Sequence, residues 1–195
     1  MPRASRAQAE SHRQQVVAAA SAQVRAQGAE RLTVTDVMAA AGLTHGGFYR
    51  HFRNKDDLVA QACAAACAEK VAEMREMLAT TTDPATARRD YLRHYLSARH
   101  RDHPDHGCGI AALVTDVVRA PHDSPLRRTY LDGLRNMIDG LAEFGDRPDN
   151  PDDRERDVLA ELALMVGALV LARATADDDL SDRFLTAARD RLGGE

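Results

Sequence analysis

Apolar residues recur every three or four positions along most of this 195-residue chain, which is the spacing of one face of an α-helix. The pattern is clear at Val158, Leu162, Met165 and Leu169, after a helix start signal at 150–153 that combines a capping asparagine, a proline and two acids. Aromatic residues make up only 4% of the chain, which counts against an all-β fold. The sequence therefore predicts an all-α protein of about nine helices.

Glycines, prolines and capping residues indicate where these helices start and stop. We expect the helices to begin near Gln8, Thr33, Thr44, Lys55, Asp83, Gly107, Leu126, Asn150 and Leu180. Residues 1–7 lack periodicity and are predicted to be a mobile basic arm, and the His- and Asp-rich segment 100–106 is predicted to be a loop. The eighth helix is apolar nearly all round, so it must be covered on two sides.

Hydropathy and cysteine usage exclude several classes of protein. The charge-free apolar stretch at 162–172 is about half of the ~20 residues that a membrane span needs, and no apolar signal segment follows the polar N-terminus. The three cysteines have no paired spacing and predict no disulfide framework. Cys63 and Cys67 lie on an Ala-rich helix face and are expected in the core. We expect a cytoplasmic protein with no membrane contact and no cofactor.

The net charge of −4 is unevenly distributed. Residues 1–55 carry eight basic and three acidic side chains, a net charge of +5, whereas the remaining 140 residues carry a net charge of −9. A basic end joined to an acidic body suggests a polyanion-binding module on a separate scaffold. A chance fluctuation among solvated charges could give the same numbers, so the spacing of the residues has to decide.

Residues 34–52 have the layout of a helix-turn-helix: a short helix, a turn at Gly42-Leu43 and a second helix. At 100° per residue, Phe48 and Phe52 share the inner face of the second helix. The opposite arc carries His45, Gly46, Tyr49, Arg50 and Arg53. Such a face suits the major groove of DNA, because it offers hydrogen-bond donors and a cation beside positions without bulk.

The residue types on this face predict their roles. Gly46 and Gly47 each cost a helix about 1 kcal/mol relative to alanine, a cost that close approach of the backbone to DNA would explain. His45 and Arg50 can reach base edges. Phosphate contacts, which fix the register on DNA, are expected from Thr33, Thr35, Thr44, Tyr49 and Lys55.

A Gly-hydrophobic-Thr turn, a Phe-Tyr-x-His-Phe core and a Lys-Asp-Asp-Leu helix start follow one another between Leu32 and Leu58. Together they resemble the N-terminal domain of TetR-family transcriptional regulators. The resemblance implies a homodimer that binds a palindromic operator in double-stranded DNA, usually as a repressor, and is released by a small effector of unknown identity. It also implies an arm and helix-turn-helix domain at 1–55 and a helical effector-binding and dimerisation domain at 56–195.

The family pattern implies roles for individual residues. Phosphate contacts would come from Thr33, Thr44, Tyr49, His51 and Lys55, and the residues nearest the bases would be His45, Gly46 and Gly47. Arg50 occupies a position that often holds an aromatic or polar residue in the family. His51 lies on the flank of the helical wheel, so a packing role and a phosphate contact are both open.

The resemblance also places an effector pocket among the fifth to eighth helices and a dimer interface on the eighth and ninth. The candidate pocket residues are Tyr91, Tyr95, Cys108, Tyr130, Met137 and Met165. Any one of them is more often ordinary core than pocket lining. The candidate dimer residues are Leu162, Val166, Leu169, Val170, Phe184, Leu185 and Ala188.

Cys108 opens the sixth helix in a Gly-Cys motif that is similar to one in a branch of TetR regulators that includes sensors of electrophiles and oxidants. A helix N-terminus and the imidazoles of His103 and His106 would lower the pKa of its thiol. Such a sensor can use a lysine, but both lysines, Lys55 and Lys70, lie in or just after the DNA-binding region. The alternative is a small buried residue that packs the helix start.

Two further alternatives involve the same segment. A metal sensor could use His100, Asp102, His103, Asp105, His106 and Cys108. Because Pro104 in a polar loop is poor preorganisation for a metal site, we expect a solvated connector and no metal. A helical-bundle thiol enzyme or a ligand carrier is the competing class, with Cys108 and His106 as its only candidates. It would leave the helix-turn-helix face unexplained, so we expect no catalytic residue.

Overall fold

The computed structural model describes residues 2–145 and 147–193, and within these ranges it contains helices and no strand. The helices are α1 (Pro2–Gln27), α2 (Val34–Ala40), the 3-10 helix η1 (His45–Arg50), α3 (Lys55–Thr80), α4 (Pro84–Tyr95), α5 (Ala98–Asp102), the 3-10 helix η2 (Pro104–His106), α6 (Gly109–Arg119), α7 (Pro125–Ala142), α8 (Pro151–Ala174) and α9 (Leu180–Gly193). The all-α prediction is confirmed. None of these helices combines the length and the apolarity that crossing a membrane requires.

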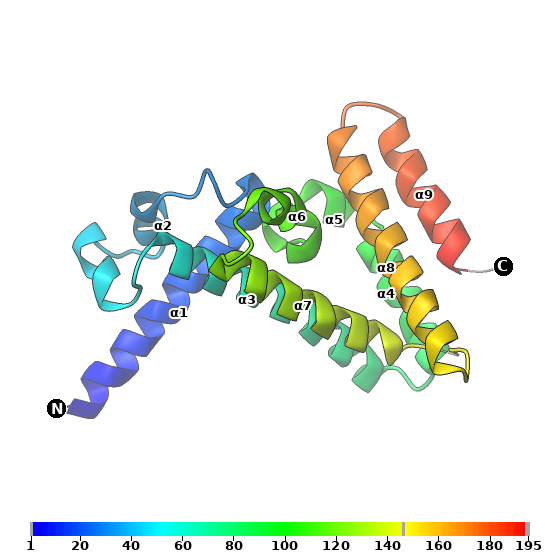
Figure 1. Cartoon of the computed structure of the whole chain (residues 1–195), viewed down its shortest axis with the longest axis horizontal. Coiled ribbons are helices and arrows are strands. Elements are labelled where there is room, and N and C mark those ends of the chain that lie inside the picture. The colour runs from blue at the N-terminus through cyan, green and yellow to red at the C-terminus, as the bar shows by residue number, and fades with distance from the viewer. Residues whose placement is uncertain (1, 146, 194–195) are drawn as a thin grey trace.

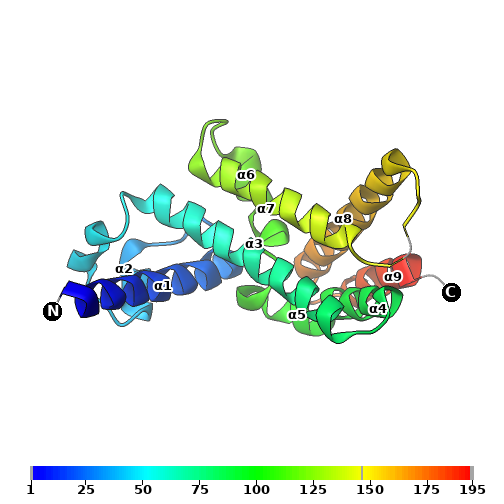
Figure 2. The ribbon, with the colours of Figure 1, turned by 90° about the horizontal axis from the view of Figure 1, so that it is seen from below.

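The helices form two ends that one long helix connects (Figures 1 and 2). The N-terminal helices α1, α2 and η1 lie at one end, and α8 and α9 form an antiparallel pair at the other. The long helix α3 connects the two ends, because it packs on α1 near its start and on α7 along most of its length. The predicted division of the chain at residue 55 falls in the first turn of α3.

The capping residues of the sequence start the helices at the expected places. The side chain of Thr33 accepts a hydrogen bond from the Asp36 N–H at 3.1 Å, and that of Asn54 accepts from the Asp57 N–H at 2.8 Å. Each cap satisfies a backbone donor that the first helical turn leaves without a partner. A proline follows the cap in α4, α7 and α8, where its missing N–H costs nothing.

A seam of close contacts joins α3 to α7. A Cβ atom at Gly133 would lie 2.6 Å from the Cys67 Sγ, and one at Gly140 would lie 3.3 Å from the Met74 side chain. These distances are too short for a larger residue at Gly133 without movement of one helix, because both partners belong to packed helix faces. Cys63 and Cys67 are buried here, as the sequence predicts.

An ion-pair cluster holds the C-terminal helices together around Glu161 of α8, which is almost fully buried. Arg88 of α4 donates to the Glu161 carboxylate from Nη2 at 2.9 Å, and Arg147 donates to it from Nη1 at 2.7 Å. Arg88 also donates to the Leu192 carbonyl of α9 at 3.0 Å. The cluster fixes α4, α8 and α9 to one another, and no motif in the sequence points to it.

Two expectations about the helix boundaries are wrong. Helix α1 begins at Pro2 instead of near Gln8, and of the predicted arm only Met1 lies outside the described residues. Arginine, alanine and glutamine dominate residues 3–9, and these are good helix formers that extend α1 to its proline. The segment 100–106 is not a loop, because Ser97 accepts a hydrogen bond from the His100 N–H at 3.1 Å and starts α5. Helix η2 follows it.

The second helix of the helix-turn-helix is a 3-10 helix and not the longer α-helix that the sequence predicts. Gly46 and Gly47 have a low α-helix propensity, and the Gly47 N–H donates to the Thr44 carbonyl three residues earlier at 3.0 Å. Thr44 takes the capping position, but its side chain makes no capping hydrogen bond with the described residues. Its predicted role as a cap is therefore wrong.

Candidate DNA-binding surface and effector region

The inner face of the helix-turn-helix packs as the sequence predicts. Gly42 turns the chain with a φ of +70°, a conformation that costs glycine little. The next residue, Leu43, donates its N–H to the Met38 carbonyl at 2.8 Å. Phe48 and Phe52 are buried, and their rings stack with centroids 5.4 Å apart. The turn and the two rings together fix the orientation of η1.

The outer face of η1 is open to solvent. Tyr49 is 74% exposed and packs edge-on against Phe48, with ring centroids 5.1 Å apart. His45, Gly46 and Arg50 are exposed beside it. A Cβ atom at Gly46 would meet none of the described atoms within 4 Å, so packing inside the protein requires no glycine there. We call His45, Gly46, Tyr49 and Arg50 the reading surface.

The other predicted DNA-contact residues surround the reading surface. Thr33, Thr35 and Thr44 are exposed, and Gly47, His51 and Lys55 are half-buried. Thr33 and Lys55 also have structural roles, because Thr33 caps α2 and the Lys55 Nζ donates to the Glu30 carbonyl at 2.9 Å. The His51 ring lies 6.2 Å from that of Phe52, so its packing role and its phosphate contact both stay open.

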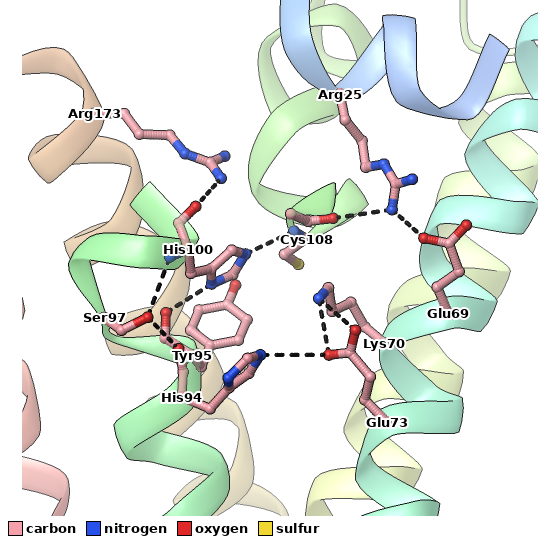
Figure 3. Close-up of polar contacts among 11 residues, drawn as sticks. Arg25, Glu69, Lys70, Glu73, His94, Tyr95, Ser97, His100, Cys108 and Arg173 are labelled. Atoms are coloured by element: carbon pink, nitrogen blue, oxygen red, sulfur yellow. Dashed lines mark hydrogen bonds and ion pairs between the residues drawn. The ribbon is translucent and has the colours of Figure 1, made fainter. Parts of the chain in front are cut away.

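The side chains of Arg25 and Asp116 join the N-terminal helices to the helices that follow. Arg25 of α1 is buried, pairs with Glu69 of α3, and donates from Nη1 to the Gly107 carbonyl at 3.3 Å (Figure 3). Asp116 of α6 accepts a hydrogen bond from the Ala29 N–H at 3.0 Å. The sequence patterns point to neither residue, because both contacts join segments far apart in the chain.

Cys108 lies in a corner between α4, α5 and α6, where it is fully buried and forms the N-cap position of α6. Its N–H donates to the Nε2 of His100 at 2.9 Å, and the His100 Nδ1 donates to the Tyr95 carbonyl at 2.7 Å (Figure 3). A ring that accepts at one nitrogen and donates at the other is neutral. Burial lowers the pKa of His100 to about 3. His100 is thus a structural residue, and the predicted solvated connector is wrong at this position.

Of the two interpretations of Cys108, the structure favours the small buried residue that packs the helix start over an activated thiol. Burial raises the pKa of Cys108, and this effect outweighs the contact with the Tyr95 hydroxyl and the backbone N–H groups of the first α6 turn, which lower it. The imidazole beside Cys108 belongs to the neutral His100, whereas His103 and His106 are exposed. A buried thiol with a raised pKa is mostly protonated at neutral pH, and the thiolate is the reactive form.

Lys70 lies closer to this corner than its place in the sequence indicates. It is buried on α3, its Nζ donates to both carboxylate oxygens of Glu73 at 2.8 Å, and Figure 3 shows this pair facing His94 and Cys108. Helix α3 is long enough to run from the DNA-binding end into the body, which brings Lys70 there. Among the described residues, no group of three or more His, Cys, Asp and Glu side chains is placed to hold a metal ion.

The neutral state of His100 predicts how stability depends on pH. In the unfolded chain His100 binds a proton below its ordinary pKa of about 6.5, whereas the folded protein keeps it neutral down to about pH 3. Stability contributed by His100 is therefore present above pH 6.5 and is lost as the pH falls, by about 2 kcal/mol at pH 5. We expect urea unfolding between pH 7 and pH 5 to show this loss in the wild type and not in His100→Asn.

His122, which is exposed between α6 and α7, supplies the control for this measurement. His122→Asn should keep the full pH dependence of the wild type. An equal loss of stability between the two pH values in the wild type and in His100→Asn would contradict the assignment of the effect to His100.

The six candidate pocket residues are all buried in the body of the protein. Tyr130 donates its hydroxyl to the Ile110 carbonyl at 3.1 Å. The hydroxyls of Tyr91 and Tyr95 make no hydrogen bond with any described residue. Among the candidate tyrosines, the protein therefore provides a hydrogen-bond partner for the hydroxyl of Tyr130 and none, within the described residues, for those of Tyr91 and Tyr95.

The candidate dimer residues divide into two groups. Leu162, Leu169, Leu185 and Ala188 are buried inside the protomer. They pack in the core between α8, α9 and the other helices, so their assignment to a dimer surface is wrong. Val166, Val170 and Phe184 are partly exposed, and the exposed apolar residues beside them on α8 and α9 include Leu159, Leu171 and Leu180.

Comparisons with known proteins agree with this geometry. A family model described as "Bacterial regulatory proteins, tetR family" matches residues 16–62. A TetR transcriptional regulator from Chloroflexus aurantiacus J-10-FL is similar, with 25% identity and a TM-score of 0.74 over 95% of this chain and 94% of that chain. The reduced form of E. coli NemR is 17% identical, with a TM-score of 0.76 over 93% of this chain and 95% of that chain. No curated protein sequence matches.

The all-helical body and the exposed reading surface define a helix-turn-helix DNA-binding protein. Residues 16–62, which include the helix-turn-helix, match the TetR-family model, and solved structures of TetR-family regulators share the fold over nearly the whole chain. Regulators of this family bind operator DNA and form homodimers. Membership of the Gly-Cys branch stays a prediction.

Proposed function

We propose that this protein is a homodimeric repressor that binds a palindromic operator and is released when a small effector binds among its C-terminal helices. The observation that carries the proposal is the reading surface, which combines an exposed cation, an imidazole and a phenol around a glycine that the protein itself does not need. Side chains of these types read base edges and contact phosphates in the major groove.

The distribution of charge along the chain supports an orientation in which the reading surface faces the DNA. The +5 end contains the reading surface, and the −9 body lies at the far end of the molecule. A polyanion attracts the first and repels the second. The protein would therefore approach DNA with α2 and η1 first.

Helix α6 connects the proposed effector region to the DNA-binding end. Its first residues adjoin Cys108, which lies beside the buried tyrosines of α4, and its Asp116 holds the Ala29 backbone after α1. A ligand shifts a conformational equilibrium only when it binds one state better than the other. A ligand that displaced α6 would meet this condition, because the Asp116 contact would move with the helix and change the position of α1.

Dimerisation would use the exposed side of α8 and α9. Leu159 and Leu171 of α8 and Leu180 of α9 are large apolar side chains that the protomer leaves exposed. Burying them against a second copy would remove apolar surface from water. A two-fold dimer places two reading surfaces on successive turns of the major groove, about 34 Å apart.

A sensor that acts through the Cys108 thiol is a weaker candidate. Burial and a raised pKa keep this thiol in its unreactive form. Equal operator affinity of the wild type and Cys108→Ser, before and after treatment with an electrophile, would exclude it.

The test of the proposed function is selection of DNA from a random pool by the purified protein, followed by binding to the selected site. We expect a palindromic site and a steep fall in affinity with salt, because a dimer releases counterions at several phosphates. Arg50→Ala should cost about 1–3 kcal/mol of binding and relax the preference for one base pair in each half-site. Lys55→Ala should weaken binding to all sequences alike.

Arg75 on α3 provides the matched control for Arg50, since it is an exposed arginine twenty residues after the start of α3, away from both the reading surface and the side of α8 and α9 proposed for dimerisation. Arg75→Ala should leave both the affinity and the base preference unchanged. Recovery of no common sequence, or an Arg50→Ala variant with unaltered preference, would contradict the proposed use of the reading surface.

A further inference from the structure

Two buried hydroxyl groups on α4 have no hydrogen-bond partner among the described residues. Tyr91 and Tyr95 lie one helical turn apart, with ring centroids 6.0 Å apart, and each is only 1% exposed. Tyr130, in the same core, does have a partner, the Ile110 carbonyl. Buried hydroxyls without a partner cost free energy and are rare in folded proteins. The pair on α4 therefore requires an explanation that core packing alone does not give.

The charged groups around this pair are already engaged. Lys70 is paired with Glu73, and Arg88 and Arg147 are paired with Glu161. The Arg173 guanidinium donates to the carbonyls of His100 and Arg101. His100 uses both of its ring nitrogens and is neutral. A cationic ligand would find no free carboxylate among these groups, and the Arg173 guanidinium, which has no carboxylate partner among the described residues, is already held by two backbone carbonyls.

The two phenols are themselves neutral. Burial raises the pKa of Tyr91 and that of Tyr95 well above the ordinary tyrosine value. Each hydroxyl can therefore both donate and accept a hydrogen bond at neutral pH. The Tyr95 hydroxyl has a polar neighbour, the Cys108 thiol, and their side-chain contact contributes to the raised pKa of Tyr95, but a thiol is a weak hydrogen-bonding group.

The Tyr91 ring has an aromatic neighbour, and the core that contains the pair also contains flexible side chains. The Tyr91 ring stacks on Phe144, with centroids 5.3 Å apart and an angle of 19° between the planes. Met74, Met137 and Met165, from α3, α7 and α8, are buried in the same hydrophobic core. Methionine side chains are flexible and fill irregular spaces, so they can rearrange around an added molecule.

We propose that Tyr91 and Tyr95 form the polar part of an interior binding site for a small, uncharged and mainly apolar molecule that carries a hydrogen-bonding oxygen. Its flat or alkyl part would pack against Phe144 and the three methionines, and its oxygen would take the hydrogen bonds that the two hydroxyls lack. The inference rests on the proposed function, because it names the chemical class of the effector.

The test uses four single-ring compounds of similar size on the purified full-length protein: acetophenone, ethylbenzene, benzoate and benzylamine. They differ in carrying a neutral oxygen, no polar atom, an anion and a cation. We expect acetophenone to raise the unfolding temperature most and to bind most tightly by calorimetry. Tyr91→Phe and Tyr95→Phe should each weaken acetophenone binding by about 5- to 10-fold, because each removes one hydrogen bond. Neither should change the binding of ethylbenzene.

The same variants without ligand provide a second readout. Tyr91→Phe and Tyr95→Phe should unfold at the wild-type temperature or above it, because they remove a hydroxyl that has no partner. Tyr130→Phe, the matched control, should unfold at a lower temperature, because it loses a satisfied hydrogen bond.

Three results would each overturn the inference. Tyr91→Phe and Tyr95→Phe could destabilise the free protein as Tyr130→Phe does, which would mean that an internal water already satisfies the hydroxyls. Benzoate or benzylamine could bind more tightly than acetophenone. Acetophenone could bind no better than ethylbenzene. These measurements use protein without DNA, so a failure of the proposed repressor function would appear separately, as a wild-type protein that selects no operator.

Discussion

Replacing Gly46 with leucine is expected to lower the affinity for the selected operator by roughly 100-fold or more while the protein stays folded. The glycine faces outward, and a side chain there meets none of the described atoms of the protein itself within Cβ contact distance. On DNA the same side chain would hold η1 away from the bases in both half-sites of a dimer. Since one good base contact is worth about 1–3 kcal/mol, the loss of contacts at two half-sites reaches this magnitude.

The unfolding temperature of variants at position 46 distinguishes this effect from misfolding. A glycine in a helix costs about 1 kcal/mol relative to alanine, so Gly46→Ala should unfold at the wild-type temperature or slightly above it. Ala72→Leu adds comparable bulk at an exposed position of α3, distant from the reading surface, and should leave operator binding unchanged. Wild-type operator affinity in Gly46→Leu would show that η1 does not approach the bases.

Replacing Glu161 with alanine is expected to be the most destabilising of the substitutions considered. Removal of one partner from a buried ion pair leaves the other charge without compensation and typically costs about 3–5 kcal/mol. Here the loss affects both Arg88 and Arg147: Arg88 loses its ion pair, whereas the almost fully buried Arg147 keeps a second one, with Asp157. For a chain of this length the unfolding temperature should fall by roughly 10 °C, measured by circular dichroism.

The control for Glu161 lies on the same helix. Glu155 of α8 is exposed, so Glu155→Ala removes the same side chain without disturbing a buried charge and should change the unfolding temperature by little. A similar small change in Glu161→Ala would mean that Arg88 and Arg147 find other partners, and that the cluster does not hold α4, α8 and α9 together.

The fold was largely predictable because its determinants are local. Caps such as Thr33, Asn54 and Asn150 act within one helical turn, and the apolar spacing along each helix is set by its own geometry. The reading surface was predictable for the same reason, since Phe48 and Phe52 on one side of a short helix decide which residues face outward. The errors at residues 2–7 and in η1 come from weak local preferences, which do not fix where a helix starts or how tightly it winds.

The body of the protein was less predictable because its determinants join distant segments. His100 was expected in a solvated loop, but it satisfies the backbone of Cys108 inside the core. The dimer residues were inferred from apolarity, which does not distinguish a core position such as Leu169 from an exposed one such as Leu171. The Glu161 cluster and the Asp116–Ala29 contact depend on how helices far apart in sequence are packed, and no spacing rule within one helix encodes that.

The seam between α3 and α7 has a consequence for how sequences with this fold can vary. Gly133 and Cys67 touch so closely that a single added carbon at Gly133 would push the two helices apart. Such a position tolerates few replacements although it lies inside the body, away from any surface that meets DNA. Among relatives of this protein, an invariant glycine on α7 would therefore record how closely two helices pack, and should not be taken as a mark of recognition. The residues that define operator choice would be those free to change at no cost to folding, as Gly46 is.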